Sequence, residues 1–312
     1  MTAVIHPWHE QSWKRLLEQL RAGRLPHALL LQAPPGAGME DFTESLLGLL
    51  LCREPSPEGA CGHCRGCSLL AAGSHPDLRR LVPEEEGKAI RIEAIREVID
   101  FVQMSSQEGE RRVALLTPAE AMNRNAANSL LKTLEEPPAG AILLLQSHRP
   151  QLLPVTVRSR CQRLDLRCRD RAQALAWLRG QLPQAEEADE LLELYPEAPL
   201  RALQAREAEL PERRRELLAE LLALIRGSEE PVELAGRWQQ RGAAMTLELL
   251  EGLLREQARD ATRAGDLHKS AEGLELRQLF RWYDLVSQAR QELESQNNLR
   301  EETVLETLTL SW

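Results

Sequence analysis

One loop constrains the fold of this chain more than any other feature. It spans residues 33–40, with the sequence APPGAGME, and joins an apolar strand candidate at 28–31 to an amphipathic helix candidate that extends to about Leu51. A strand, a glycine-containing loop and a helix in this order are typical of the phosphate-binding loop of α/β proteins, in which backbone amides at the helix N-terminus hold the phosphates. The pattern therefore predicts a nucleotide-binding fold.

The loop lacks the side chains that ATP chemistry needs. The working pattern, G-x-x-x-x-G-K-[ST], uses its lysine to reach the β- and γ-phosphates and its hydroxyl to hold Mg²⁺. Met39 stands at the lysine position, Glu40 at the hydroxyl position and Ala33 at the first glycine. A carboxylate beside a triphosphate repels it, so we predict a nucleotide-binding fold that binds no ATP. The alternative is an ordinary tight turn marked by Gly36 and Gly38.

Further strands and helices alternate along the first half of the chain. Strands are predicted at 27–32, 78–82, 112–116, 142–145 and 162–166, and helices at 8–21, up to 51, around 92–102, at 128–136 and at 152–158. This alternation predicts a parallel α/β sheet covered on both faces. In a working ATPase of this architecture, the strand at 112–116 would end in acidic residues that bind Mg²⁺ and polarise water. Thr117 and Pro118 stand there and can do neither.

Four of the six cysteines cluster directly after the helix that extends to about Leu51. They are Cys52, Cys61, Cys64 and Cys67. Two overlapping C-x-x-C steps and a fourth thiol can close a tetrahedron around Zn²⁺ with no open position, which predicts a structural site rather than a catalytic one. His63 could compete as a ligand, but with four thiols available we leave it outside the set. The alternatives are four unligated cysteines or a zinc ribbon that binds nucleic acid.

Composition limits the class of protein. At 312 residues, 43% hydrophobic and 28% charged, the chain can bury a sizeable core in two or three domains. It has no apolar run near the roughly 20 residues of a membrane span and no signal-like N-terminus, so we expect a cytoplasmic protein without membrane association. Its six cysteines are then expected to be metal ligands or core residues rather than disulfides. The net charge is −9, with 20 basic and 20 acidic residues in 1–167 but 19 and 28 in 168–312. Such a chain is expected to bind DNA weakly by itself.

The second half of the chain has no strand pattern. Residues 170–205 predict three short helices, interrupted at Pro183 and at Pro196 and Pro199, and helical spacing begins again at Pro211 and continues to the end of the chain. We therefore predict three domains, at 1–167 with a zinc module at 52–67, at 168–208 and at 209–312. The aromatics Trp238, Trp282 and Tyr283 are expected to lie in a core or an interface rather than to stack on nucleic-acid bases.

Six stretches resemble one family, the delta-prime subunits of the bacterial DNA polymerase III clamp loader, which belong to the AAA+ group. They are HALL at 27–30, the loop at 33–38, CGHCRGC at 61–67, SHPD at 74–77, NSLLKTLEEPP at 128–138 and SRC at 159–161. Together they cover residues 27–161 in order. Over 168–312 the resemblance rests on helical pattern and length.

The resemblance implies an AAA+ type α/β domain with an inserted zinc module, a small helical lid at 168–208 and an all-α collar at 209–312 that forms oligomers. It also implies a five-membered loader that places the sliding clamp on primer–template DNA, with gamma or tau motor subunits and delta as the other members. A delta-prime subunit binds no ATP and is not an enzyme on its own. It is a rigid scaffold that donates the arginine of its Ser-Arg-Cys motif to the nucleotide of a neighbouring motor. That arginine is Arg160, with Ser159 positioning the loop and Cys161 packing inward.

The motor subunits of the same loader are the main alternative, since they share the zinc cluster, the LLKTLEEPP run and the Ser-Arg-Cys motif. Met39, Glu40, Thr117 and Pro118 separate the two, because a motor has Lys, Ser or Thr, Asp and Glu there. Leu200 stands where a motor carries a lid arginine, and Arg201 lies one place off, so no phosphate sensor is predicted. Two further hypotheses are an ATPase that binds nucleotide through an unusual loop and a stand-alone zinc protein that binds nucleic acid, which the acidic balance disfavours.

Overall fold

The computed structural model describes residues 4–56, 58–85, 87–207, 210–263, 274–294 and 301–312. The chain divides into two compact units, Met1–Gln204 and Ala205–Trp312. The predicted boundary at 208/209 lies outside the described residues, and the division into three domains stays a prediction.

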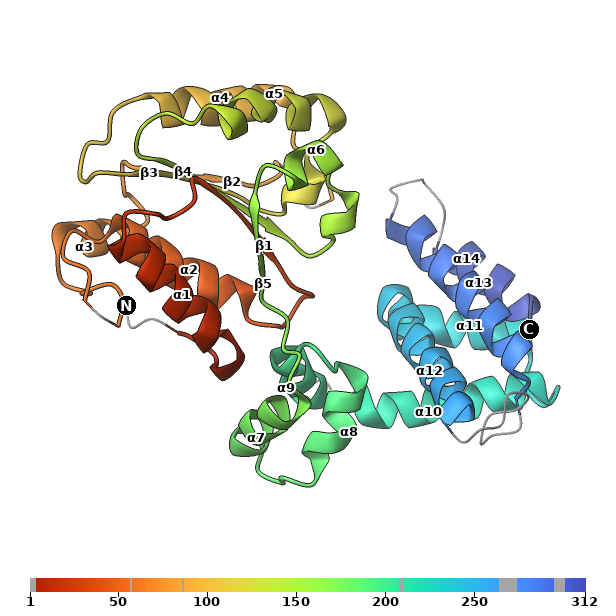
Figure 1. The fold of residues 1–312 in the computed structure, drawn as a ribbon. Helices are drawn as coiled ribbons and strands as arrows, with labels where there is room; N and C mark the ends of the chain where they lie inside the picture. The colour runs from red at the N-terminus through yellow and green to blue at the C-terminus, as the bar shows by residue number, and fades with distance from the viewer. Residues whose placement is uncertain (1–3, 57, 86, 208–209, 264–273, 295–300) are drawn as a thin grey trace. The chain divides into compact units, whose positions relative to one another are not determined.

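The first unit is built on a five-stranded sheet (Figure 1). Its strands are β1 (Ala28–Gln32), β2 (Leu78–Leu81), β3 (Arg112–Leu116), β4 (Ala141–Ser147) and β5 (Gln162–Asp165). They lie in the order β2-β3-β4-β1-β5, and every neighbouring pair is parallel. The inner strands β3 and β4 are buried along their whole length, because helices cover both faces of the sheet. The parallel α/β sheet predicted from the sequence is confirmed.

Helices from different parts of the chain cover the two faces (Figure 1). One face is covered by α1 (Glu10–Arg21) and α2 (Met39–Leu51), with α3 (Arg65–Ala71) beside α2, and the other by α4 (Ile92–Gln103), α5 (Arg124–Glu135) and α6 (Val155–Arg158). Short 3₁₀ turns are η1 (Pro7–His9), η2 (Ala119–Ala121) and η3 (Pro150–Leu152). Because side chains alternate along a strand, Leu29 of β1 packs with Phe42 of α2, while Leu30 packs with Leu130 of α5.

The largest differences from the predicted elements lie in three helical segments. Helix α5 begins at Arg124 rather than at Asn128, because the Asn123 side chain caps it by accepting a hydrogen bond from Ala126 N (2.9 Å). The helix predicted at 152–158 is split into η3 and α6 by an extended segment that includes Pro154. Helix α3 was not predicted, since its seven residues are too few to show helical periodicity.

Three short helices follow the sheet, as predicted: α7 (Arg171–Gln181), α8 (Glu187–Leu194) and α9 (Pro199–Glu207). The second unit contains α10 (Leu210–Ile225), α11 (Pro231–Gln240), α12 (Ala243–Arg263), α13 (Leu276–Glu294) and α14 (Glu301–Leu310). Trp238 and Trp282 are buried there, and both rings contact Trp312, which confirms them as core aromatics. Within the described ranges, no strand follows Asp165 and no helix is both long and apolar enough to cross a membrane.

Candidate functional site

The glycine-containing loop is covered on one side by the start of α9. Gly36 has a φ of +78°, and its carbonyl oxygen accepts hydrogen bonds from Leu200 N (3.0 Å) and Arg201 N (3.4 Å). A Cβ at Gly36 would lie 2.7 Å from Arg201 N, so the two backbones touch. The Arg201 guanidinium lies over the Tyr195 ring, 4.8 Å from its centre. The backbone amides at the start of α9, which would otherwise favour an anion, are thus bonded to the loop itself.

The N-terminal segment covers the loop next to Gly38. Gly38 has a φ of +83° and precedes the first residue of α2, and a Cβ there would lie 2.4 Å from Cδ2 of His6. His6 Nε2 lies 2.9 Å from the Asp41 carboxylate, and the His6 ring stacks on Trp8. Trp8 in turn donates its indole N–H to Ala37 O (2.9 Å). Sequence reasoning missed both His6 and Trp8, because neither belongs to a periodic pattern.

The two side chains that replace the ATP-binding residues have different surroundings. Met39 is fully buried in the core. The Glu40 carboxylate accepts a hydrogen bond from Gln146 Nε2 (3.2 Å) and lies 3.2 Å from Nε2 of His148. His148 Nδ1 lies 2.9 Å from Ala33 O, so both ring nitrogens face acceptors and the charged imidazolium is favoured. The hydrogen bond between them lowers the pKa of Glu40 and raises the pKa of His148.

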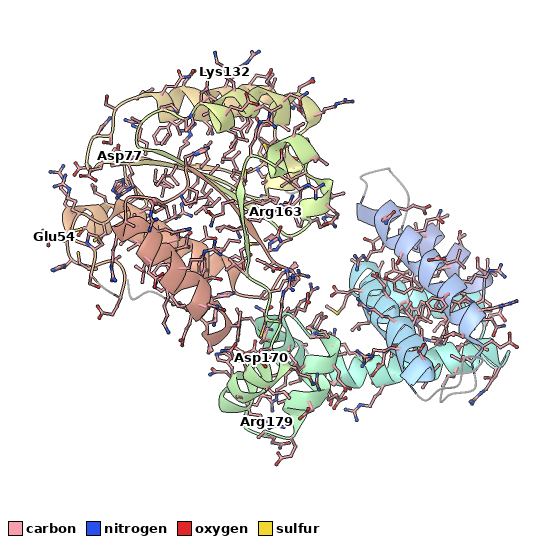
Figure 2. All side chains as sticks on the ribbon, viewed as in Figure 1. Glu54, Asp77, Lys132, Arg163, Asp170 and Arg179 are labelled. Atoms are coloured by element: carbon pink, nitrogen blue, oxygen red, sulfur yellow. The ribbon has the colours of Figure 1, made fainter. Side chains whose placement is uncertain are left out.

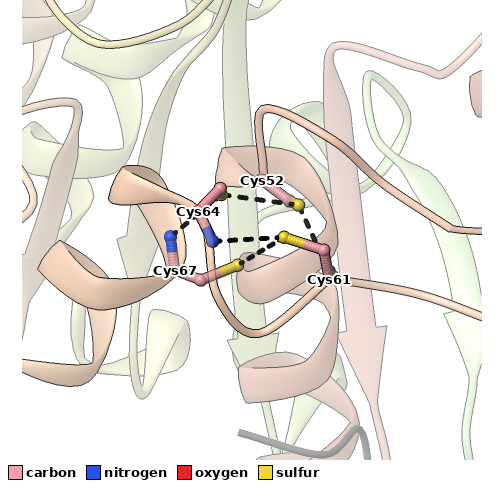
Figure 3. Close-up of side chains that lie close together, drawn as sticks. All are labelled: Cys52, Cys61, Cys64 and Cys67. Atoms are coloured by element: carbon pink, nitrogen blue, oxygen red, sulfur yellow. Dashed lines mark hydrogen bonds between the residues drawn. The ribbon is translucent and has the colours of Figure 1, made fainter.

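The four clustered cysteines converge on one point (Figure 3). Their sulfur atoms all lie within 4.8 Å of one another, with Cys52 Sγ 3.8 Å from Cys64 Sγ and Cys61 Sγ 3.9 Å from Cys67 Sγ. A tetrahedral zinc site with bonds of about 2.3 Å requires sulfurs about 3.8 Å apart. The spacing therefore fits the metal that the sequence predicts. His63 is exposed and groups instead with Glu54 and Cys61.

Backbone amides surround the sulfur atoms. Cys61 N donates to Cys52 Sγ (3.3 Å), Cys64 N to Cys61 Sγ (3.3 Å) and Cys67 N to Cys64 Sγ (3.5 Å). Burial raises the pKa of Cys52 and raises that of Cys67 to about 12. At Cys64 burial acts in the same direction, but the amide hydrogen bonds outweigh it and lower the pKa to about 6. Four thiolates so close together need a cation among them, so these cysteines could hold a metal ion.

The Ser-His-Pro-Asp segment at 74–77 stabilises a loop beside the cysteine cluster. Asp77, labelled in Figure 2, is fully buried, and its carboxylate accepts hydrogen bonds from Gln107 N and Glu108 N, both at 2.7 Å. Glu108 in turn forms ion pairs with Arg53 and Arg65 of the cysteine module. Asp77 therefore fixes the loop before β3.

Arg160 follows α6 and bonds to two neighbouring groups. Its Nε donates to Glu135 Oε1 (2.7 Å), its Nη2 donates to the same oxygen, and its Nη1 donates to Thr156 O (2.9 Å). Ser159 Oγ donates to the same Thr156 carbonyl (3.1 Å). The Arg160 side chain is 33% exposed, whereas Cys161 is buried, as predicted, and burial raises the pKa of its thiol to about 11. No local sequence pattern signals the Glu135 contact, because the two residues lie 25 positions apart.

Comparisons with known proteins decide the family. The family model described as "DNA polymerase III, delta subunit" matches residues 8–170. The DNA polymerase III subunit delta' of Pseudomonas aeruginosa is 36% identical over 325 residues, covering 99% of this chain and 98% of that protein. The chain belongs to the DNA polymerase III delta-prime subunit family. Its sequence resemblance to that family is thereby confirmed.

Two further relatives in sequence match shorter parts of the chain, and one solved structure matches nearly all of it. The subunit delta' of Escherichia coli is 38% identical over 59% of this chain and 55% of that protein. The subunit tau of Salmonella typhimurium is 34% identical over 50% of this chain and 24% of that protein. A DNA polymerase III gamma subunit-related protein from Thermotoga maritima has a similar structure, with a TM-score of 0.52 and 20% identity over 96% of this chain and 97% of that one. The predicted AAA+ type fold, a parallel-sheet domain followed by helical regions, is confirmed.

Proposed function

We propose that this chain is the delta-prime subunit of a DNA polymerase III clamp loader that binds no ATP and donates Arg160 in trans to the nucleotide of a neighbouring motor subunit. Its partners are gamma or tau motor subunits and delta, and through the complex the sliding clamp and primer–template DNA, all in the cytoplasm. A structural Zn²⁺ bound by Cys52, Cys61, Cys64 and Cys67 stabilises the first unit. The observation that carries the proposal is the loop at 33–40, which is covered by residues of its own chain.

Three features of the loop argue against ATP as its ligand. The start of α9 bonds to Gly36 O, and the His6 ring packs against Gly38. Met39 offers no charge to a phosphate and is held in the core. The Glu40 carboxylate at the first turn of α2 repels a polyphosphate at the place where a motor subunit holds Mg²⁺. The nearby His148 ring is already bonded to that carboxylate.

The chemistry of Arg160 supports its role as a finger. A guanidinium is always charged and offers a planar set of N–H groups that matches the oxygens of a phosphate. Supplied in trans, such a group stabilises the charge of the transition state and can contribute on the order of 10³–10⁵ in rate at its site. Ser159 and Arg160 bond to the same carbonyl of α6, so Ser159 helps to fix the turn that carries the arginine.

Nucleotide binding by the isolated chain tests the first half of the proposal. Fluorescent ATP is titrated into the chain at millimolar Mg²⁺, with a gamma-type motor subunit as the positive control. No saturable binding is expected in the micromolar range. Saturable micromolar binding would contradict the proposal and favour the ATP-hydrolysing motor alternative.

Arg160→Ala tests the second half. The loader is reconstituted with clamp, primed DNA and the variant chain, and the DNA-stimulated ATPase rate is expected to fall while assembly is unchanged. Arg163→Ala is the matched control, because Arg163 is an exposed arginine three positions away on β5 (Figure 2). Unchanged turnover with Arg160→Ala would remove this arginine from its role.

A further inference from the structure

The LLKTLEEPP run at 130–138, one of the stretches that resemble the family, has a defined conformation in the structure. It forms the second half of α5, which ends at Glu135 before Pro137 and Pro138. The inner face of α5 is buried through Leu130, Thr133 and Leu134. Lys132 lies on its exposed side (Figure 2). Packing of the inner face therefore fixes where the helix ends, and with it the place of the Glu135 side chain.

The Glu135 carboxylate accepts hydrogen bonds from the edge of the Arg160 guanidinium that carries Nε and Nη2. The single oxygen Oε1 accepts from both Nε and Nη2, and Thr156 O accepts from Nη1. A guanidinium has five N–H groups, so three are engaged within the chain. The two that remain are one on Nη1 and one on Nη2. A phosphate group with two oxygens facing the arginine can accept one hydrogen bond from each of these two N–H groups.

We propose that Glu135 is a positioning residue for Arg160, a role that rests on the proposed function. It fixes the arginine in one rotamer, so that one N–H of Nη1 and one of Nη2 are presented to the phosphate of the neighbouring subunit. A free arginine side chain has many rotamers, and ordering it at the moment of reaction would lower the rate. The pair is solvent-exposed and stabilises the fold little, so its consequence is orientation.

The bonding pattern predicts an order among substitutions. Glu135→Ala removes the acceptor and is expected to abolish about nine-tenths of the Arg160-dependent ATPase rate, a tenfold effect of the size expected from arginine rotamer freedom. Glu135→Gln keeps an Oε1 that can accept both N–H bonds, and is expected to retain at least a third of that rate. Glu136→Ala removes the same charge from the adjacent exposed residue and is expected to leave the rate unchanged.

The experiment compares these three variants, Arg160→Ala and the double variant Glu135→Ala/Arg160→Ala in reconstituted loaders with clamp and primed DNA. The part of the rate that Arg160→Ala removes is the reference. The expected decrease with Glu135→Ala lies in kcat rather than in the KM for ATP, because the nucleotide is bound by the neighbour. Melting temperature is measured for each chain and is expected to be unchanged, since alanine is favourable at an exposed helix end.

The outcomes separate the two proposals. A double variant equal to Arg160→Ala supports positioning, because Glu135 then acts only through the arginine. A normal rate with Glu135→Ala, while Arg160→Ala lowers it, overturns the positioning role alone. A double variant slower than Arg160→Ala also overturns it, since Glu135 would then act independently. An unchanged rate with Arg160→Ala overturns the proposed function and the positioning role together.

Discussion

The stability that the contact between α9 and the loop contributes can be measured by adding one methyl group at Gly36. Gly36→Ala places a Cβ at a φ of +78°, which costs an L-residue about 1–2 kcal/mol. That Cβ would also lie 2.4 Å from Arg201 Cβ and 2.7 Å from Arg201 N, so the start of α9 has to move away. The two hydrogen bonds to Gly36 O are then lost, at about 0.5–1.5 kcal/mol each. We expect a total destabilisation of about 2–5 kcal/mol.

Gly23→Ala is the matched control for this substitution. Gly23 has a φ of +65°, but a Cβ there would meet nothing within 4 Å, so only the backbone cost of about 1–2 kcal/mol applies. Urea unfolding gives the free energies, and hydrogen exchange of the α9 amides reports whether the loss is local to the loop. If Gly36→Ala costs no more than Gly23→Ala, α9 does not rest on the loop, and the steric argument against ATP binding fails.

Two further predictions concern the first unit. Chelation of zinc, or Cys64→Ser, is expected to lower both the melting temperature of this unit and its zinc content, because four converging thiols lose the cation that joins them. Equal melting temperatures with and without metal would show that the cysteine cluster does not stabilise the unit. His9 is fully buried, and burial lowers its pKa from 6.5 to about 4, so its contribution to stability is present above pH 6.5 and is lost as the pH falls toward 4. At about 1.4 kcal/mol per pKa unit this contribution amounts to about 3 kcal/mol. His9→Gln is expected to flatten the dependence of the free energy of urea unfolding on pH between those pH values. Parallel pH profiles for the two chains would refute this role of His9.

The inner strands of the sheet were predictable from the sequence because they are buried on both faces. Continuous apolar runs such as 28–31 and 113–116 are what such strands require, and β3 begins and ends where it was predicted. The cysteine cluster was predictable because zinc demands a fixed number of thiols at short spacings. Both patterns are local in the sequence. A buried strand requires a short apolar run, and a zinc site requires closely spaced cysteines.

The contacts that define the sites were not predictable in this way. His6 on Gly38, Arg201 on Gly36 and Glu135 on Arg160 each join residues far apart in the chain, and none produces a periodic pattern. The resemblance to a family supplied Arg160 but no partner for it. The Asn123 cap left a local signal, since asparagine favours that position, and the start of α5 could have been placed from it.

The proposed function requires the fold to keep one arrangement without a nucleotide. In a motor subunit, ligand binding shifts the protein between states because ATP contacts them differently. Here the corresponding contacts lie within the chain: the amides at the start of α9 bond to Gly36 O, and His148 pairs with Glu40 rather than with a phosphate. These bonds do not depend on a ligand that can be hydrolysed or released. Under the proposed function this subunit holds Arg160 toward a neighbour, and movement of its loop and of α9 with each ATP cycle would move the arginine as well.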